Sequence, residues 1–297
     1  MKARRLAFFF IVCVATMLFD LGANSAAVGA VEQGLDIQPV RLPFVYRSYV
    51  QGAGSVTGKV FDATSIDRLP LSDVSVCYLD QCAVTASDGM YLIENLPDGF
   101  RRLSASRLEY YSMTENVAIR PFETAEQDFA LTPLSEITDV FMRILLTWSE
   151  TETWPPDDIR NDLDAHLWLE APDPPTHINF EDRGDCTTFP DACLEVDYQK
   201  GYGPETLAIR QLQNTVYYYG VLNYYSGYPG VPEIVYSQAM VRVYLEGGTT
   251  MEYTVPATGS GDFWYVFQLV SDGTTATVIE RNCITTFDGS PPTCPGE

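Results

Sequence analysis

Short runs of alternating apolar and polar residues dominate the chain after residue 52. Turn residues separate these runs, and examples are VTGKVFD, VSVCYL, MYLIENL, NVAIRP and QDFAL. Alternation with a period of two puts one side of a β-strand against a core and the other toward solvent. After Phe19, no stretch keeps the 3.6-residue apolar period of a helix for three turns. The pattern therefore predicts short strands in a β-sandwich or barrel, with little helix.

The first 30 residues have a different pattern. Lys2 and two arginines precede an apolar run over residues 6–19, and small residues follow that run. This order is typical of a secretory signal peptide. The run is also shorter than the roughly 17 to 25 residues of a membrane-spanning helix. We therefore expect residues 1–30 to be a signal peptide and the protein to be secreted, either extracellular or at the cell surface, with no membrane insertion after signal removal.

Cysteine spacing independently supports export. Cys13 lies in the signal peptide, and the other six cysteines form three close couples. An even number of cysteines in an exported protein indicates disulfides, and the absence of any CxxC pair disfavours a zinc site. Pairing between neighbours closes the shortest loops. The expected disulfides are Cys77–Cys82, Cys186–Cys193 and Cys283–Cys294.

The charge balance narrows the range of partners. The chain has 40 acidic and 18 basic residues, and its formal net charge is −22. A surface this acidic repels phosphate backbones and anionic lipids, so nucleic-acid binding and peripheral membrane binding are not expected. Solubility is one explanation of the acidity. Calcium binding is another, because hard cations take their ligands from carboxylate and carbonyl oxygens.

Residues 52–134 contain a series of motifs with a specific spacing. These are VTGKVFD from Val56, LPLSDVSV from Leu69, TASDGMYLIENLPDG from Thr85 and ETAEQDFAL from Glu123. Within them Asp88 and Gly89 supply a turn, and Leu92 and Leu96 are expected core residues. The segment resembles the carboxypeptidase regulatory-like domain, which has a transthyretin-like fold. The resemblance implies a seven-stranded sandwich used as an accessory or spacer module, and it brings no peptidase residues.

The pattern breaks at LTPLSEITD, and a second segment covers residues 139–286. Its motifs are RILLTWSE, DLDAHLWL, HINF, LEVDYQKGYGPE, YYYGVLNYYSG, AMVRVYLEGG and FWYVFQL. This segment is similar to the YfaP-like domains of unknown function, which implies a second sandwich and assigns no activity. The expected fold is all-β, with two consecutive antiparallel β-sandwich domains after the signal peptide. Residues 31–51 form an extended lead-in, and residues 287–297 form a C-terminal tail.

A polar row in NDLDAHLWL is a candidate metal site. Asp162, Asp164 and His166 lie on one face of the expected strand. Asp197 and Glu205 flank a glycine-rich turn that can bring them close to this row. A set rich in oxygen ligands favours calcium over zinc. We expect the two aspartates of the row, Asp197 and Glu205 to bind calcium, with His166 as a hydrogen-bonding neighbour. The alternative is that the aspartates accept backbone hydrogen bonds at a strand start and that the histidine is a buried, satisfied imidazole.

Catalytic chemistry has little support in the sequence. Asp162 and Asp164 are a carboxylate pair, but residues two apart on a strand point the same way and do not face each other across a substrate bond. The chain has no GxSxG elbow, no HExxH helix and no phosphate-binding loop. Pairing of the cysteines also removes a thiolate nucleophile. We therefore expect a protein that is not an enzyme.

Tyrosines crowd one stretch between residues 217 and 228. Exposed rings with polar tips can stack on sugars or on protein surfaces. Tyrosine is also a good strand former, so alternate rings, either Tyr217 and Tyr219 or their neighbours on the opposite face, are expected in the core. The candidate ligand-stacking residues are Tyr218, Tyr224, Tyr225 and Tyr228.

Together these features predict a secreted, non-catalytic structural or adhesive cell-surface module that calcium stabilises. The expected partner is a cell-surface protein or a glycan. A carbohydrate-binding accessory protein is the alternative, and an exposed aromatic platform would distinguish the two. Residues 31–50 can also pair with a sheet edge of this chain or of a second copy, although a flexible lead-in with two prolines is the favoured explanation.

Overall fold

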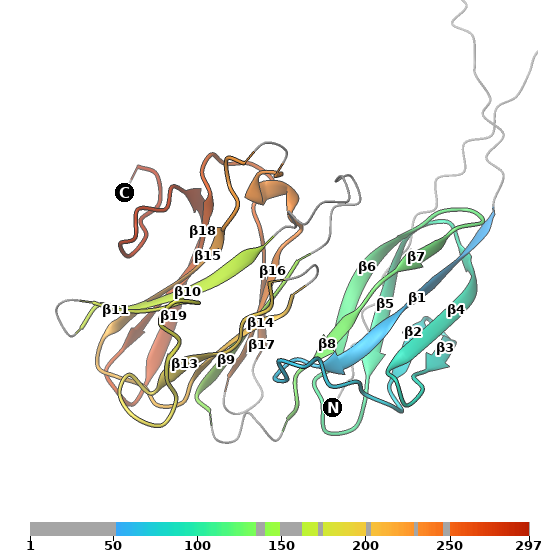
Figure 1. Cartoon of the computed structure of the whole chain (residues 1–297), viewed down its shortest axis with the longest axis horizontal. Helices are drawn as coiled ribbons and strands as arrows, with labels where there is room; N and C mark the ends of the chain where they lie inside the picture. Colours follow the sequence, from blue (N-terminus) through green and yellow to red (C-terminus); the bar gives the residue numbers. More distant parts are fainter. Residues whose placement is uncertain are drawn as a thin grey trace, which may run out of the picture. The chain divides into compact units, whose positions relative to one another are not determined.

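The computed structural model describes residues 52–134, 140–148, 162–171, 175–199, 203–228, 231–245 and 250–296. The predicted signal peptide, lead-in and residue 31–50 pairing segment lie outside the described residues, as does Gly201 of the glycine-rich turn. In the described part of the chain, no helix is both long enough and apolar enough to cross a membrane. The described residues belong to one compact unit, Tyr49–Glu297. As predicted, the regular secondary structure described in this unit is almost entirely β-strand (Figure 1).

The first eight strands make two four-stranded sheets. They are β1 (Ala53–Asp62), β2 (Ser75–Tyr78), β3 (Gln81–Val84), β4 (Met90–Pro97), β5 (Gly99–Ser106), β6 (Met113–Ile119), β7 (Thr124–Glu126) and β8 (Phe129–Leu131). One sheet has the order β4-β1-β7, with β8 also paired to β1, and the other has the order β3-β2-β5-β6. Most pairs are antiparallel, but β7 and β8 both run parallel to β1.

Alternation along these strands builds the first core. In β4, Tyr91 and Ile93 are buried while Met90 and Leu92 face outward. The expectation that Leu92 is a core residue is therefore wrong, because the strand register turns it to the outer face, where its side chain is 50% exposed. Leu96 is buried as expected.

The remaining strands make a second, larger sandwich. They are β9 (Met142–Thr147), β10 (Leu163–Leu169), β11 (Thr176–Ile178), β12 (Gly184–Asp185), β13 (Ala192–Val196), β14 (Glu205–Ile209), β15 (Val216–Asn223), β16 (Met240–Leu245), β17 (Thr250–Thr254), β18 (Phe263–Ser271) and β19 (Ala276–Thr285). A five-stranded sheet, β11-β10-β15-β18-β19, faces a six-stranded sheet, β12-β13-β14-β9-β16-β17. Their inner faces share one hydrophobic core, to which Tyr217 and Tyr219 contribute buried rings.

A small third cluster joins the two sandwiches. Its buried members are Phe61, Ala63, Ala130, Leu145 and Tyr244. Polar contacts flank the cluster: the Thr206 hydroxyl donates to the backbone oxygen of Ala63 at 2.7 Å, and Arg242 donates to Glu115 at 2.9 Å. The sandwiches are therefore connected by packed and hydrogen-bonded side chains as well as by the chain itself.

The cysteine pairing predicted from the sequence is confirmed. The disulfides are Cys77–Cys82, Cys186–Cys193 and Cys283–Cys294. The first closes the β2–β3 hairpin, where its two cysteines are register partners. The third ties the C-terminal segment to β19. Cross-links of this kind are typical of proteins that work outside the reducing cytosol.

Candidate metal centre

The four carboxylates predicted as ligands belong to three parts of the second sandwich. Asp162 directly precedes β10, and Asp164 is the second residue of that strand. Asp197 directly follows β13, and Glu205 begins β14. One oxygen atom each from Asp164, Asp197 and Glu205 lies within 4.8 Å of the other two. We call the four residues together the carboxylate centre.

The start of β10 explains why Glu205 turns inward. On that side of the sheet β11 pairs only with Leu167–Leu169, so the first half of β10 has a free edge there. The Ala165 backbone N–H points out of this edge and donates to the Glu205 carboxylate at 2.5 Å. The Ala165 N–H, which would otherwise donate to a neighbouring strand, thus donates to an acidic side chain from the facing sheet. This hydrogen bond places the Glu205 carboxyl group in the interior.

Burial makes the carboxylate centre unusual. Asp162 is 5% exposed, Asp164 3% and Glu205 1%. Each of the four residues has one buried oxygen without a hydrogen-bond partner, including Oδ1 of Asp197. Within the described part of the chain, no basic side chain forms a salt bridge with any of the four. Uncompensated polar atoms at such depth cost free energy, so the arrangement needs protons or a cation to balance it.

The pKa values respond to this crowding. Burial, and then the charge of Asp197, raises the pKa of Asp162 to about 6. Burial together with the charges of Asp162 and Asp197 raises the pKa of Asp164 to about 8. Burial and then the charge of Asp164 raise the pKa of Glu205 well above its ordinary value. Near neutral pH, a positively charged ligand would therefore compete with protons for these oxygens.

The donor set fits a hard divalent cation. Calcium binds oxygen at about 2.3 to 2.6 Å, so two ligands on opposite sides of one ion lie about 4.6 to 5.2 Å apart. The oxygens of Asp164, Asp197 and Glu205, each within 4.8 Å of the others, can therefore contact one ion. Zinc prefers histidine and cysteine ligands. All six cysteines in the described part of the chain are in disulfides.

His166 has a different partner from the one expected. Its Nδ1 shares a hydrogen bond with Nε2 of His177 at 2.8 Å, and its Nε2 has no hydrogen-bond partner. The ring lies 5.5 Å from that of Trp168 and 5.0 Å from that of Phe287. Burial, and then its neighbour His177, lowers the pKa of His166 to about 3, so the imidazole is neutral. His166 therefore belongs to an aromatic cluster on the outer face of the sheet and donates no hydrogen bond to the carboxylate centre.

The candidate stacking tyrosines do not form a flat row. Tyr218 is half-buried on the outer sheet face, where its hydroxyl donates to Glu170 at 3.4 Å. Tyr224 and Tyr225 meet at 5.0 Å with perpendicular rings, and Tyr225 and Tyr228 meet at 5.8 Å with an interplanar angle of 85°. Tyr224 is 46% exposed and Tyr228 58%. Their edge-to-face packing differs from the parallel platform on which sugar rings stack.

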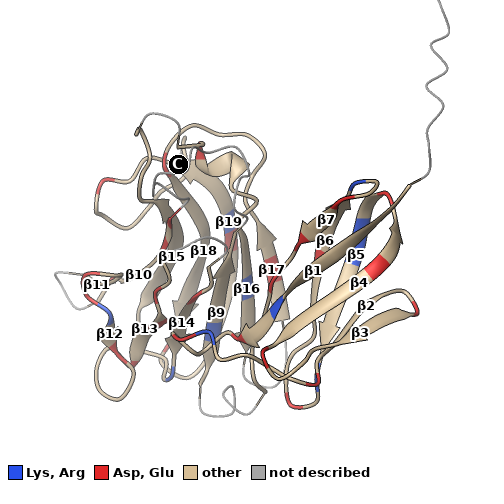
Figure 2. Ribbon diagram, turned by 45° about the vertical axis from the view of Figure 1, so that its right-hand side comes forward, with Lys and Arg blue, Asp and Glu red and all other residues tan. Residues whose placement is uncertain are grey.

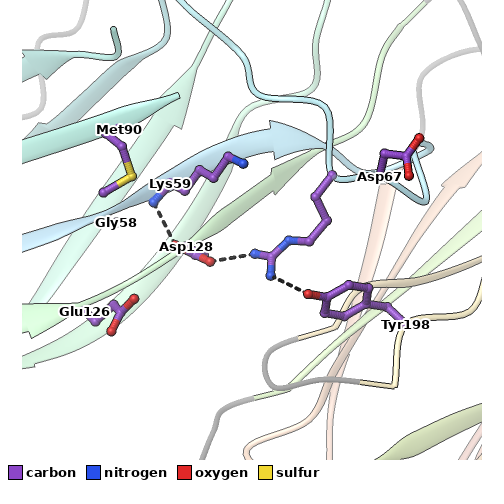
Figure 3. Close-up of a pocket in the computed structure, with 8 residues that line it drawn as sticks. Gly58, Lys59, Asp67, Met90, Glu126, Asp128 and Tyr198 are labelled. Carbon is purple, nitrogen blue, oxygen red and sulfur yellow. Dashed lines mark hydrogen bonds and ion pairs between the residues drawn. The ribbon is translucent and has the colours of Figure 1, made fainter. Parts of the chain in front are cut away.

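A separate cavity of about 410 Å³ borders Arg68 and Tyr198 (Figure 3). The Arg68 guanidinium donates to Asp128 at 2.6 Å and to the Tyr198 hydroxyl at 3.4 Å. The Lys59 backbone N–H donates to the same aspartate at 2.7 Å. These groups satisfy one another, and Arg68 also lies over the Phe61 ring at 3.9 Å. The residues that line the cavity therefore link the two sandwiches. They do not converge on one point as catalytic residues would.

Comparisons with solved structures found likenesses of low sequence identity and low TM-score. No family model matches the chain, and no curated protein sequence matches it. A protein of unknown function, SAV2460, is 17% identical over 48% of this chain and 88% of its own, with a TM-score of 0.38. A Bacteroides uniformis protein, provisionally described as carbohydrate-binding, is 9% identical over 76% of this chain and 98% of its own, with a TM-score of 0.22. A DUF3823 family protein from Bacteroides ovatus is 12% identical over 69% of this chain and 100% of its own, and its TM-score is also 0.22.

Proposed function

We propose that this chain is a non-catalytic structural or adhesive module of the extracellular surface, and that a calcium ion holds its second sandwich together. The observation that supports this most strongly is the buried carboxylate centre. Carboxylates repel one another in a medium of low dielectric constant, and a divalent cation among them replaces repulsion with attraction. Strand β10, the end of β13 and the start of β14 would then be linked through the ion.

Enclosure of the centre supports a structural role over a catalytic one. Asp164 and Glu205 are almost fully buried, so a polymeric substrate has no access to them. Glycoside hydrolysis needs two acids on either side of an accessible bond, about 5 to 9.5 Å apart. Three disulfides and a packed junction between the sandwiches are features of a scaffold that holds its shape outside the cell.

A carbohydrate-binding accessory role has weaker support. Sugar recognition by aromatic side chains uses open, parallel ring faces. Tyr224, Tyr225 and Tyr228 instead pack edge to face. We therefore favour a cell-surface protein over a glycan as the partner.

Thermal unfolding tests the role of calcium. The mature protein, stripped with a chelator, is melted with and without calcium. If only the folded state binds the ion, free calcium at 100 times its Kd adds about 2.7 kcal/mol. For a protein of this size the melting temperature should rise by about 5 to 10 °C. Asp164→Asn should remove most of this rise, because it replaces one of the three mutually close carboxylate ligands with a neutral amide.

A matched surface variant serves as the control. Asp80→Asn removes the same charge from an exposed turn between β2 and β3, and it should keep the full calcium response. Magnesium at the same concentration should raise the melting temperature less, because it sheds its water reluctantly and demands octahedral geometry. Identical melting curves of the wild-type protein with and without calcium would refute the proposal.

A further inference from the structure

Four aromatic side chains, two of them exposed and two half-buried, form a cluster beside the carboxylate centre. They are Phe180, Tyr224, Tyr225 and Tyr228, and we call them the aromatic patch. The rings of Phe180 and Tyr224 meet edge to face at 5.4 Å, and the other two rings continue the chain of contacts at 5.0 and 5.8 Å. Tyr224 and Tyr228 are about half exposed, so a large part of each tyrosine side chain faces solvent.

The patch is fixed to the carboxylate centre by its backbone. The Tyr224 N–H donates to the backbone oxygen of Asp162 at 3.1 Å. Two successive turns follow, in which Ser226 donates to Asn223 at 3.0 Å and Tyr228 donates to Tyr225 at 3.1 Å. Tyr225 lies close enough to the centre for the negative charges of Asp162 and Asp164 to contribute to its raised pKa, after burial. The backbone that carries the exposed rings is therefore held in place by hydrogen bonds.

Acidic side chains flank the patch. Glu181 and Asp182 directly follow Phe180 and are exposed, and their backbone N–H groups donate to Oδ1 of Asn179 at 2.8 and 2.9 Å. The next residue, Arg183, forms no salt bridge with either of them among the described residues, and its guanidinium donates instead to the backbone oxygens of Leu194 and Glu195. Acidic residues also outnumber basic ones over the whole chain, and both sandwiches carry them (Figure 2).

We propose that the aromatic patch, with Glu181 and Asp182, is a docking surface for a protein with a basic surface. Lysine and arginine side chains bind over the faces of tyrosine rings, and this attraction adds to pairing with the two carboxylates. Tyrosines held rigidly in place are also common anchors of protein interfaces, and complementary charge speeds encounter. Perpendicular rings offer single faces for separate cationic side chains, and they give no continuous parallel row on which successive sugar rings of a glycan could stack. The inference deepens the proposed adhesive function by naming the class of partner.

Binding of cationic peptides tests this surface. The probes are nona-arginine and nona-lysine, with nona-glutamate as the reference, and affinities are measured at about 0.15 M salt. The double variant Tyr224→Ser/Tyr228→Ser is compared with wild type and with Tyr236→Ser, which removes a tyrosine that is 63% exposed outside the patch. All three proteins have the same charge, so any general attraction of the acidic chain for a cation is the same in each.

The double variant should bind nona-arginine about 5- to 30-fold more weakly than wild type, as expected from the loss of two cation–π contacts. Tyr236→Ser should stay within about twofold of wild type. Equal affinities of wild type and the double variant for nona-arginine would overturn the proposal. It would also be overturned if the double variant lost only binding to a glycan array, because the patch would then be a sugar-binding surface. The double variant keeps all four carboxylates, so its calcium-induced melting shift tests the proposed function separately.

Discussion

At the scale of single residues, one aspartate and two histidines make stability depend on pH in opposite directions. Without calcium, the folded pKa of Asp164 is about 8, far above its ordinary value of 3.8, so the folded state binds protons that the unfolded state releases. Stability is then lost as pH rises from about 4 to 8. His166 and His177 have folded pKa values of about 3 and 4, below the ordinary 6.5, so their contribution is lost as pH falls below about 6.5.

We therefore expect the calcium-free protein to lose stability between pH 6 and pH 8. Ionisation of Asp164 alone should lower the free energy of unfolding by on the order of 2 kcal/mol across this range. Urea unfolding in the presence of a chelator, repeated at several pH values, measures the slope. The side chain at position 164 cannot ionise in Asp164→Asn, so the free energy of unfolding of this variant should depend less on pH. A wild-type protein whose stability rises between pH 6 and pH 8 would contradict this assignment.

At the scale of elements, the C-terminal segment after β19 acts as a cover. The Phe287 ring lies 5.0 Å from that of His166 and 5.5 Å from that of Phe263, and the Phe287 N–H donates to Asp262 at 2.8 Å. Under this cover Trp168 is only 1% exposed, although it points away from the inter-sheet core. The disulfide to Cys294 fastens the segment to the sheet.

Phe287→Ala should therefore destabilise the second sandwich, by about 1 to 3 kcal/mol, because it opens space above the buried ring of Trp168. Urea unfolding followed by tryptophan fluorescence measures the loss, and the emission of the native state should shift to the red. Phe122→Ala, which truncates a ring that is 84% exposed, is the control and should change stability little. Equal effects of the two substitutions would mean that the segment is not a cover.

Local sequence patterns predicted more of the fold than of the carboxylate centre. The disulfides join cysteines close in sequence, and alternation is a property of neighbouring residues, so both were accessible from the sequence. The placement of Asp162 and Asp164 beside Glu205 depends on the contact of β10 with β14, which no local pattern specifies. The partnership of His166 with His177 likewise follows from the pairing of β10 with β11, and it had a usable signal, since these are the only two histidines of the chain. Leu92 was misplaced because its neighbours Tyr91 and Ile93 take the inward register.

At the scale of the whole molecule, the junction between the sandwiches couples their unfolding. Tyr111 packs against the buried Tyr244 at a ring distance of 4.7 Å, next to the cluster that joins the two sandwiches. Arg242 adds hydrogen bonds to Thr114 and Glu115 across the junction. A contact of this kind stabilises each sandwich only while the other is folded.

Tyr111→Ala should weaken this coupling. Scanning calorimetry of the wild-type protein should give one transition, and the variant should give a broader one or two, because truncation removes an aromatic contact worth about 1 kcal/mol beyond its buried area. Phe100→Ala, at a position 79% exposed in the first sandwich, should leave the single transition unchanged. Separate transitions already present in the wild-type protein would show that the junction does not couple the sandwiches.

The parallel pairing of β7 and β8 with β1 has a mechanical consequence. Strand β1 is the first strand of the first sandwich and β8 is its last. These two strands are neighbours and run in the same direction. Tension applied through the flanking chain pulls β1 toward its start and β8 toward its end. The strands are then sheared along their length, and the hydrogen bonds between them share the load instead of opening one after another. A chain under tension would therefore resist stretching at the first sandwich through the same strands that connect this sandwich to the flanking residues.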